Sequence, residues 1–283
     1  MNAGKLFLMP EGKYEVCDFS DFSKVVPPPS NKSVVLWRYL DFANLVALLS
    51  DKKLHLARAD VFPDRHEGSI TNSMMEALKR QFADRAELSK QVSGFRKLMK
   101  ESVFISCWCK EPESEAMWKL YCGGNYGVAI TVVYQDIEVS FVAQNRLYIA
   151  PVQYLDYQTQ GFPQDNLLYP FFHKRRAFAY EEEVRIAKWC SEHIPGTRKR
   201  DHAPTEEEKG IDEYELKRGE ELKVERGTGI LLEFDVETLI RNIVVHPYAP
   251  EWYFKAAKLV VEKFTPVLGE KVKWSSMRTE PLY

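Results

Sequence analysis

Short apolar segments recur along this chain, and helical patterns of unequal length separate them. The segments are rich in β-branched and aromatic residues, which is typical of strands in a buried sheet. Strands are predicted at residues 33–40, 53–57, 103–108, 126–133, 152–157, within 171–189, 229–234, 243–247 and 272–275. Helices are predicted at residues 42–49, 69–100, 113–121 and 250–264. Because helices and strands do not alternate regularly, we expect an α+β fold with a central, mostly antiparallel, split sheet flanked by helices.

A single domain is predicted for most of the chain. The 283 residues are 45% hydrophobic, which is enough for a substantial core. Residues 1–33 are predicted to form an N-terminal arm with a stiff connector around Pro27-Pro28-Pro29. The α+β domain then spans residues 34–283. Within it, residues 191–226 are densely charged and are predicted to form a surface insertion.

Charge and hydropathy narrow the class of protein. The formal net charge is −2, from 39 basic and 41 acidic residues, so the composition does not demand a nucleic acid or an anionic membrane as partner. No apolar run approaches the ~20 residues of a transmembrane helix. The segment Met1 to Pro10 lacks the pattern of a secretory signal. We therefore expect a cytoplasmic protein without a membrane partner.

The five cysteines are an odd number without framework spacing, which argues against structural disulfides. Cys107 and Cys109 lie two apart in a predicted strand, so their side chains face the same side. A zinc site would need two further ligands, and no second pair stands at ligand spacing. Reduced thiols and no metal are therefore expected.

The segment Tyr180-Glu181-Glu182-Glu183-Val184-Arg185-Ile186 brings three acids into a strand that carries an arginine. Buried charges are costly unless they are paired or used in chemistry. In an extended segment Glu181 and Glu183 face one side and Glu182 faces the other. One carboxylate could bind a ribose hydroxyl and stabilise an oxocarbenium-like centre, while the other orients or deprotonates a nucleophile. The alternative is a structural ion network in which the acids and Arg185 pair with Arg175, Arg176 or Arg38.

Two earlier strands supply further candidates for the same site. Arg38 and Tyr39 stand near the end of the first predicted strand, where a guanidinium could hold a pyrophosphate through two hydrogen bonds. Ser106 lies in a central strand, where its hydroxyl could orient a nicotinamide ribose or the catalytic acid. Arg38 and Tyr39 are therefore candidates for cofactor binding, and Ser106 is a candidate catalytic residue.

A polar loop after the second predicted strand contains Asp60, Asp64, His66 and Glu67. Such residues could bind a divalent ion for phosphodiester hydrolysis. The simpler interpretation is a turn that leads into a helix, with Gly68-Ser69 at its N-terminal cap. Because polar loops at strand ends often line binding sites, Asp64 and Glu67 are predicted to contact the substrate.

Aromatic and basic side chains near these motifs have two interpretations. Trp108, Trp118 and Tyr121 could stack on a base, but their spacing favours core positions. The run His173 to Arg176 could contact a nucleotide phosphate, or it could pair with the acids just downstream.

Six short motifs follow one another along the chain: Leu36-Trp37-Arg38-Tyr39, Phe62-Pro63-Asp64-x-x-Glu67-Gly68, Ile105-Ser106-Cys107-Trp108, Met117-Trp118-x-x-Tyr121, Gly127-Val128-Ala129-Ile130 and Tyr180-Glu181-x-Glu183-x-Arg185. In these motifs and their order the chain resembles the bacterial domain-of-unknown-function family 2971, over roughly residues 34–280. The family name supplies no reaction, so the chemistry has to be inferred from the residues.

The order Arg38, Ser106, Glu181-x-Glu183 is similar to that of arginine-type mono-ADP-ribosyltransferases. This resemblance implies a transferase that uses NAD as a substrate to modify a protein or a nucleic acid, with Glu183 catalytic and Glu181 assisting. A bacterial toxin or anti-phage effector would suit such chemistry. Two alternatives stay open: a metal-dependent nuclease or phosphoesterase at Asp60, Asp64, His66 and Glu67, and a non-catalytic sensor or partner-binding module of a defence system.

Overall fold

The computed structural model describes residues 26–81, 85–110, 113–145, 147–163, 166–190 and 229–279. Most of the predicted N-terminal arm, up to residue 25, lies outside these residues, as does the predicted insertion at 191–226. Within the described residues, no helix combines the length and the apolar character needed to cross a membrane.

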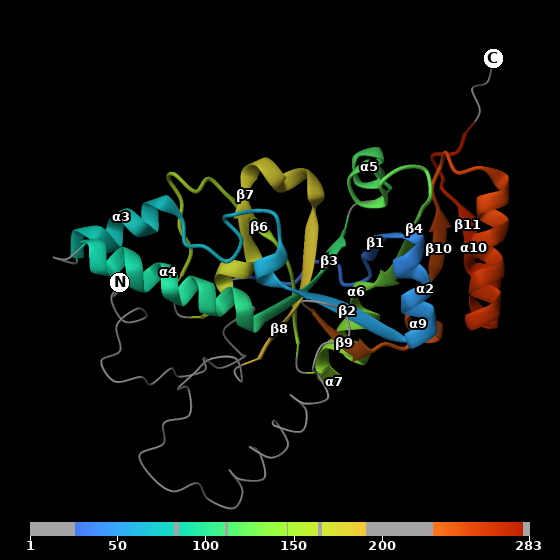
Figure 1. Cartoon of the computed structure of the whole chain (residues 1–283), viewed down its shortest axis with the longest axis horizontal. Helices are drawn as coiled ribbons and strands as arrows, with labels where there is room; N and C mark the ends of the chain where they lie inside the picture. The colour runs from blue at the N-terminus through green and yellow to red at the C-terminus, as the bar shows by residue number, and fades with distance from the viewer. Residues whose placement is uncertain are drawn as a thin grey trace, which may run out of the picture.

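A large, mostly antiparallel sheet forms the centre of the described structure (Figure 1). Its strands are β1 (Val35–Asp41), β2 (Lys53–Arg58), β3 (Val103–Cys109), β4 (Gly127–Val133), β5 (Tyr148–Pro151), β8 (Glu183–Trp189), β9 (Gly229–Glu233), β10 (Asn242–Val245) and β11 (Val272–Trp274). The main path runs β11-β10-β4-β1-β3-β2-β9, and β8 joins β3 to β5. Only β10 and β11 pair in parallel within this sheet. Two short strands, β6 (Gln153–Leu155) and β7 (His173–Arg175), form a separate parallel ladder.

Helices flank this sheet, so the predicted α+β class is confirmed. They are α2 (Phe42–Asp51), α3 (Asn72–Gln81), α4 (Arg85–Ser102), α5 (Glu115–Cys122), α6 (Tyr134–Ile137), α7 (Ala143–Asn145), α9 (Val236–Leu239) and α10 (Glu251–Phe264). Short 3-10 or π segments are η2 (Ala59–Val61), η3 (Glu138–Val142), η4 (Tyr169–Phe172), η5 (Arg176–Glu181) and η7 (Pro266–Lys271). Figure 1 shows α3 and α4 at one end of the sheet and α2 and α10 at the other.

The sheet is split along one edge of β3. This strand pairs with β8 along its whole length. On its other edge, β3 pairs with β2 at Phe104 and Ile105 and with β1 at Cys109. Between these positions β1 and β2 diverge, and residues 106–108 pair with neither strand. The divergence opens the sheet at its middle, as the sequence pattern predicted.

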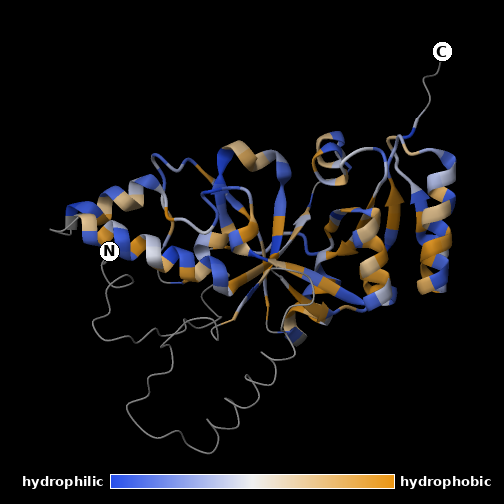
Figure 2. Ribbon diagram, viewed as in Figure 1, coloured by the Kyte–Doolittle hydropathy of each residue, from blue (hydrophilic) through white to orange (hydrophobic). Residues whose placement is uncertain are grey.

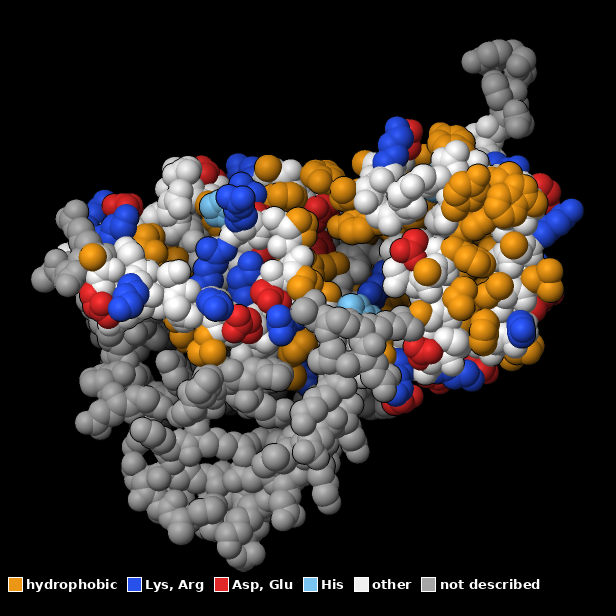
Figure 3. All heavy atoms as spheres, viewed as in Figure 1, with side chains coloured by type: hydrophobic (Ala, Val, Ile, Leu, Met, Phe, Trp, Pro, Cys, Tyr) orange, Lys and Arg blue, Asp and Glu red, His pale blue; other side chains and the backbone are white. Residues whose placement is uncertain are grey.

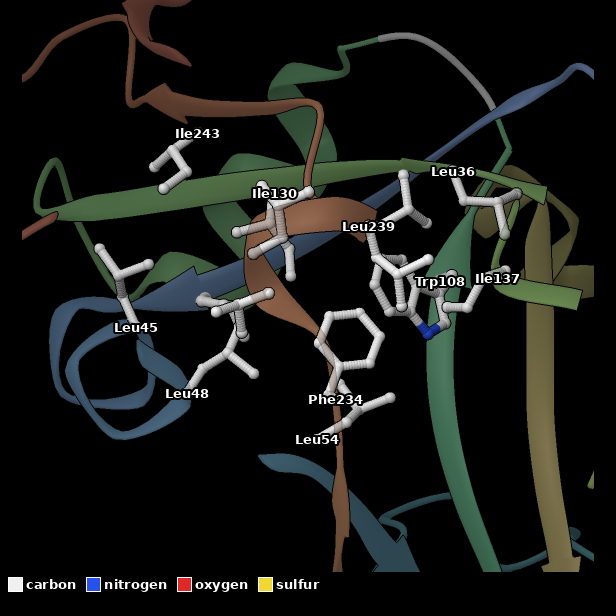
Figure 4. Close-up of a cluster of buried hydrophobic side chains, with 14 of the residues drawn as sticks. Leu36, Leu45, Leu48, Leu54, Trp108, Ile130, Ile137, Phe234, Leu239 and Ile243 are labelled. Carbon is white, nitrogen blue, oxygen red and sulfur yellow. The ribbon is translucent and has the colours of Figure 1, made fainter. Parts of the chain in front are cut away.

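Apolar side chains from the strands and from α2 and α10 form the main core (Figures 2 and 4). In Figure 4, Ile130 of the sheet lies on the side of Leu45 and Leu48 of α2, and Leu36 lies near Ile137 and Trp108. The helix α2 begins where predicted, because the Asp41 carboxylate accepts a hydrogen bond from the Asn44 N–H at 2.7 Å. Full burial of such side chains stabilises the fold by about 1.5–3 kcal/mol each.

Three local predictions were wrong. The helical region expected at 69–100 contains two helices, α3 and α4, and α3 is capped by the Thr71 hydroxyl rather than by Gly68-Ser69. The strand expected at 152–157 is limited to β6. The acidic segment is not extended throughout, because Glu181 ends the 3-10 helix η5 and Glu182 adopts a left-handed conformation (φ 42°) before β8 begins.

Candidate functional site

A cleft of about 620 Å³ opens where β1 and β2 diverge from β3. The strands β1, β2 and β3 contribute one part of its lining. The helices α2 and α5, the loop after η2, the segment η5 and the strands β7 and β8 also contribute. The space-filling view shows a hollow near the middle of the face of the molecule that is seen in Figure 1 (Figure 3). The volume falls within the ~300–1,000 Å³ that is usual for small-molecule sites.

Arg38 lies at the split and bridges the three strands around it. Its Nη2 donates to the His55 carbonyl of β2 at 3.1 Å, and its Nη1 donates to the Ser106 hydroxyl of β3. The guanidinium also lies 5.7 Å from the ring centroid of Trp108. Burial lowers the pKa of Arg38 to about 10, so the side chain keeps its charge at neutral pH. No carboxylate of the described residues lies within ion-pair distance of it, so its charge is available to an anionic ligand.

Arg185 is fully buried and occupies the centre of an ion network at the wall of the cleft. Its Nε and Nη2 donate to the two Glu183 oxygens at 2.9 and 3.2 Å. Its Nη1 and Nη2 donate to the two Glu67 oxygens at 2.5 and 2.9 Å, and Nη1 also reaches the Phe171 carbonyl at 2.5 Å. A guanidinium has five N–H donors, and this arrangement gives each of them an acceptor. Lysine could not satisfy the same set of acceptors.

Lys174 of β7 joins the two acids on which the sequence analysis concentrated. Its ammonium lies 2.5 Å from Glu181 Oε2 and 3.2 Å from Glu183 Oε2. The network therefore contains three carboxylates (Glu67, Glu181, Glu183) and two cations (Lys174, Arg185), which leaves one excess negative charge. Glu181 contacts one cation through one oxygen, whereas Glu183 contacts both cations, so the excess charge resides mainly on Glu181.

The pKa values of the two acids move in opposite directions for this reason. Burial raises the pKa of Glu181, and the contact with Lys174 only partly offsets it. Burial would also raise the pKa of Glu183, but Arg185 and Lys174 outweigh it and lower the pKa to about 2. Glu183 is therefore ionised at neutral pH, and Glu181 is the acid in this pair better suited to accept a proton.

Aromatic side chains form much of the cleft wall. Trp37 comes from β1, Phe62 from the loop after η2, and Phe178 and Tyr180 from η5. Tyr180 is more than half exposed. Flat apolar faces of this kind favour stacking with a base or a nicotinamide ring.

The fold brings six of the seven candidate residues to one cleft: Arg38, Tyr39, Asp64, Glu67, Glu181 and Glu183. Ser106 is the exception. It is 1% exposed, and its hydroxyl is held between Arg38 and the Trp108 indole N–H, which donates at 3.0 Å. By accepting a hydrogen bond from Arg38, the buried Ser106 hydroxyl can hold the guanidinium in position.

The structure agrees with the sequence-based prediction for some of the neighbouring residues and differs from it for others. Trp108 and Trp118 are buried as predicted, but Tyr121 is 43% exposed and lines the cleft, so its prediction as a core residue was wrong. Tyr39 lies at the edge of the cleft, where its ring packs edge-on against Trp118 with centroids 4.8 Å apart. Glu182 does not line the cleft and pairs with Lys110 at 2.8 Å.

The loop acids each have a basic partner. Asp60 pairs with Arg58 at 2.7 Å, Asp64 with Arg175 at 2.8 Å, and Glu67 with Arg185. Across the residues that the structure describes, no three His, Cys, Asp or Glu side chains are grouped as a metal site would require. Asp60, Asp64 and Glu67 therefore pair with different basic residues and do not converge on one position where a metal ion could bind.

Lys174, the cation that links Glu181 and Glu183, was not predicted individually from the sequence. The signal was present in the basic run before η5, and its predicted pairing with the downstream acids is confirmed for Lys174. The contribution of Phe178 had no comparable signal, because only the turn of η5 brings its ring into the cleft and within 4.8 Å of the Lys174 ammonium.

Comparison of the chain with protein-family models, with curated proteins and with solved structures finds no match. The resemblance to domain-of-unknown-function family 2971 and to ADP-ribosyltransferases therefore stays a prediction, and function has to be argued from the cleft.

Proposed function

We propose that the cleft binds NAD and that the protein is an ADP-ribosyltransferase-like enzyme that modifies a protein or a nucleic acid. One observation carries the proposal: an arginine without a carboxylate partner among the described residues and a carboxylate pair with excess negative charge line the same aromatic-walled cleft. A dinucleotide has the complementary groups, namely a pyrophosphate, two ribose rings and two flat bases.

Arg38 is the proposed pyrophosphate ligand. Two of its five N–H donors are occupied by Ser106 and His55, and these contacts hold the guanidinium in place. The remaining donors can bind phosphate oxygens, and charge-assisted hydrogen bonds of this kind are roughly twice as strong as neutral ones. Ser106 is a positioning residue in this scheme. The exposed rings of Tyr121 and Tyr180 are available to stack on the bases.

Glu183 and Glu181 have separate proposed roles. The ionised Glu183 accepts a hydrogen bond from a ribose hydroxyl and stabilises positive charge at C1′ as the bond to nicotinamide breaks. The bonding electron pair leaves with nicotinamide. A nucleophile on the target forms the new bond to C1′, and its proton passes to Glu181, whose raised pKa suits that step.

The state of the cysteines bears on the compartment in which the protein acts. The four cysteines among the described residues are free thiols, as is usual in a reducing compartment. We propose that the enzyme acts in the bacterial cytoplasm, as a toxin or an anti-phage effector on a macromolecular target.

The test is nicotinamide release and transfer of adenine-labelled ADP-ribose when the full chain is mixed with NAD and a bacterial extract. Glu181→Gln should lower both signals by at least 100-fold, in line with the contribution of a general base. Glu182→Gln is the matched control, because it removes a neighbouring charge that pairs with Lys110 outside the cleft. Wild-type signals equal to those of heat-treated protein, or to those of Glu181→Gln, would contradict the proposal.

A non-catalytic NAD-sensing module is the second candidate. The observation in its favour is that Glu183 is already neutralised by Arg185 and Lys174, as in a structural ion network. This candidate predicts NAD binding, measured by calorimetry, without nicotinamide release.

A further inference from the structure

A second cavity, of about 270 Å³, lies beside the cleft, since Glu67 lines the cleft and Gly68 lines the cavity. Residues of α3 and α4 line it, together with residues within 66–70, 162–163 and 166–171. Gly68 and Phe171 form the wall toward the cleft, next to Glu67, which faces the cleft itself. The volume is just below the ~300 Å³ that marks the lower end of ordinary ligand pockets, so the cavity suits a small molecule.

Two polar groups of this cavity have no hydrogen-bond partner in the part of the chain that the structure describes. They are the hydroxyl of Ser69, a residue only 7% exposed, and the Nε of Arg96. Leaving a buried donor unsatisfied destabilises the folded state, and the cost is larger when the group is charged. Native proteins usually satisfy such groups, so the two donors indicate a ligand that carries an acceptor.

The charge around Arg96 indicates that the acceptor is anionic. The nearby acids are already committed, Asp64 to Arg175 and Glu67 to Arg185. Arg96 itself forms no ion pair with a described residue. Burial lowers the pKa of His66, which also lines the cavity, and the charges of Arg175 and Arg96 lower it further, while Asp64 opposes them. An anion would relieve this local excess of positive charge.

The rest of the lining is mainly apolar, including Met75 and Val92 of α3 and α4 and Phe162 from the opposite side. Such a wall favours the burial of a hydrocarbon or aromatic body. We propose that this cavity is a binding site for a small apolar monocarboxylate, of about eight carbons or fewer, with its carboxylate on Ser69 and Arg96. This site is separate from the proposed NAD site, so it can be tested without NAD.

The experiment is calorimetric titration of the full chain with octanoate, octan-1-ol and octylamine. Octanoate should bind with a dissociation constant below about 1 mM, octan-1-ol at least tenfold more weakly, and octylamine not measurably. Arg96→Gln and Ser69→Ala should each weaken octanoate binding at least tenfold. Lys90→Gln is the matched control, since it removes an exposed charge from the same helix without lining the cavity, and its affinity should equal that of the wild type.

Three results would overturn the proposal. They are no octanoate binding by the wild type, equal affinity for octanoate and octan-1-ol, and unchanged octanoate affinity in both Arg96→Gln and Ser69→Ala. Using two variants on different elements keeps the test decisive if one of them does not fold, and a melting curve identifies that case.

Discussion

The two acids of the Glu-x-Glu motif should respond to the same substitution with very different losses of stability. Glu183→Gln removes a carboxylate that accepts hydrogen bonds from Arg185 and Lys174 within a buried network. Glu181→Gln removes the excess negative charge and leaves two carboxylates facing two cations. We therefore expect Glu183→Gln to destabilise the fold strongly and Glu181→Gln to change its stability little.

The pKa of Glu183 sets the size of the effect. A fall from the ordinary value of 4.5 to about 2 corresponds to about 3 kcal/mol of stabilisation when the group is ionised. We expect Glu183→Gln to lower the free energy of unfolding at pH 7 by about 3 kcal/mol. For Glu181, whose pKa is raised by burial, we expect a change within ~1 kcal/mol, because ionising it in the folded state is unfavourable.

The dependence on pH provides an internal check. Because the folded-state pKa of Glu183 is depressed, its stabilisation is complete above the unfolded pKa of 4.5 and is lost as the pH falls toward about 2. The difference in the free energy of unfolding between the wild type and Glu183→Gln should therefore be about 1 kcal/mol smaller at pH 4 than at pH 7. The raised pKa of Glu181 has the opposite sign, since its ionisation costs stability as the pH rises through the folded-state value.

Urea unfolding, followed by circular dichroism at pH 7 and pH 4, measures these free energies. Glu182→Gln is the control, because its carboxylate pairs at the surface with Lys110 and should contribute less than ~1 kcal/mol. Equal costs for Glu181→Gln and Glu183→Gln at pH 7 would refute the charge count on which this reasoning depends. A gap for Glu183→Gln that does not change with pH would refute its depressed pKa.

Three further predictions concern neighbouring positions. Arg185→Lys keeps the charge but offers three donors where the arginine makes five hydrogen bonds. We expect the free energy of unfolding, measured in urea, to fall by about 2–4 kcal/mol. A fall below ~1 kcal/mol would contradict the proposed role of Arg185 in the ion network. Gly68→Ala should destabilise by at least about 2 kcal/mol, because φ is +61° and an added Cβ would lie 2.5 Å from the Phe171 ring; an unchanged melting temperature would show that the loop adjusts without cost. Arg38→Gln should weaken NAD binding by about 2 kcal/mol, or roughly 30-fold in calorimetry, and wild-type affinity in a folded variant would exclude Arg38 as the phosphate ligand.

Much of the fold could be predicted from local patterns. Apolar strands, unequal helices and the Asp41 cap depend on residues close together in the sequence, and the structure agrees with them. Local patterns failed where a turn reverses the chain within a few residues. The segment Glu181 to Glu183 was predicted to be extended, yet the 3-10 helix η5 and a left-handed Glu182 bend it.

The candidate site was only partly predictable for the same reason. Polar residues near strand ends were recognised from the sequence, and six of them line one cleft. Their partners were not, because the Glu67–Arg185 pair joins residues 118 positions apart and the Glu181–Lys174 contact depends on the turn between them. The exposure of Tyr121 was not predicted either, because its helical spacing indicated a core position whereas the residue lines the cleft.

The sequence by itself determined the α+β class, the strand that carries Arg38, and the acids that enter β8. Only the tertiary structure decided how the charges are shared, with Glu183 neutralised by two cations and Glu181 holding the excess. The physical reason is that hydrophobic periodicity acts over neighbouring residues, whereas the energy of a buried charge depends on every group packed around it, whatever its distance along the chain.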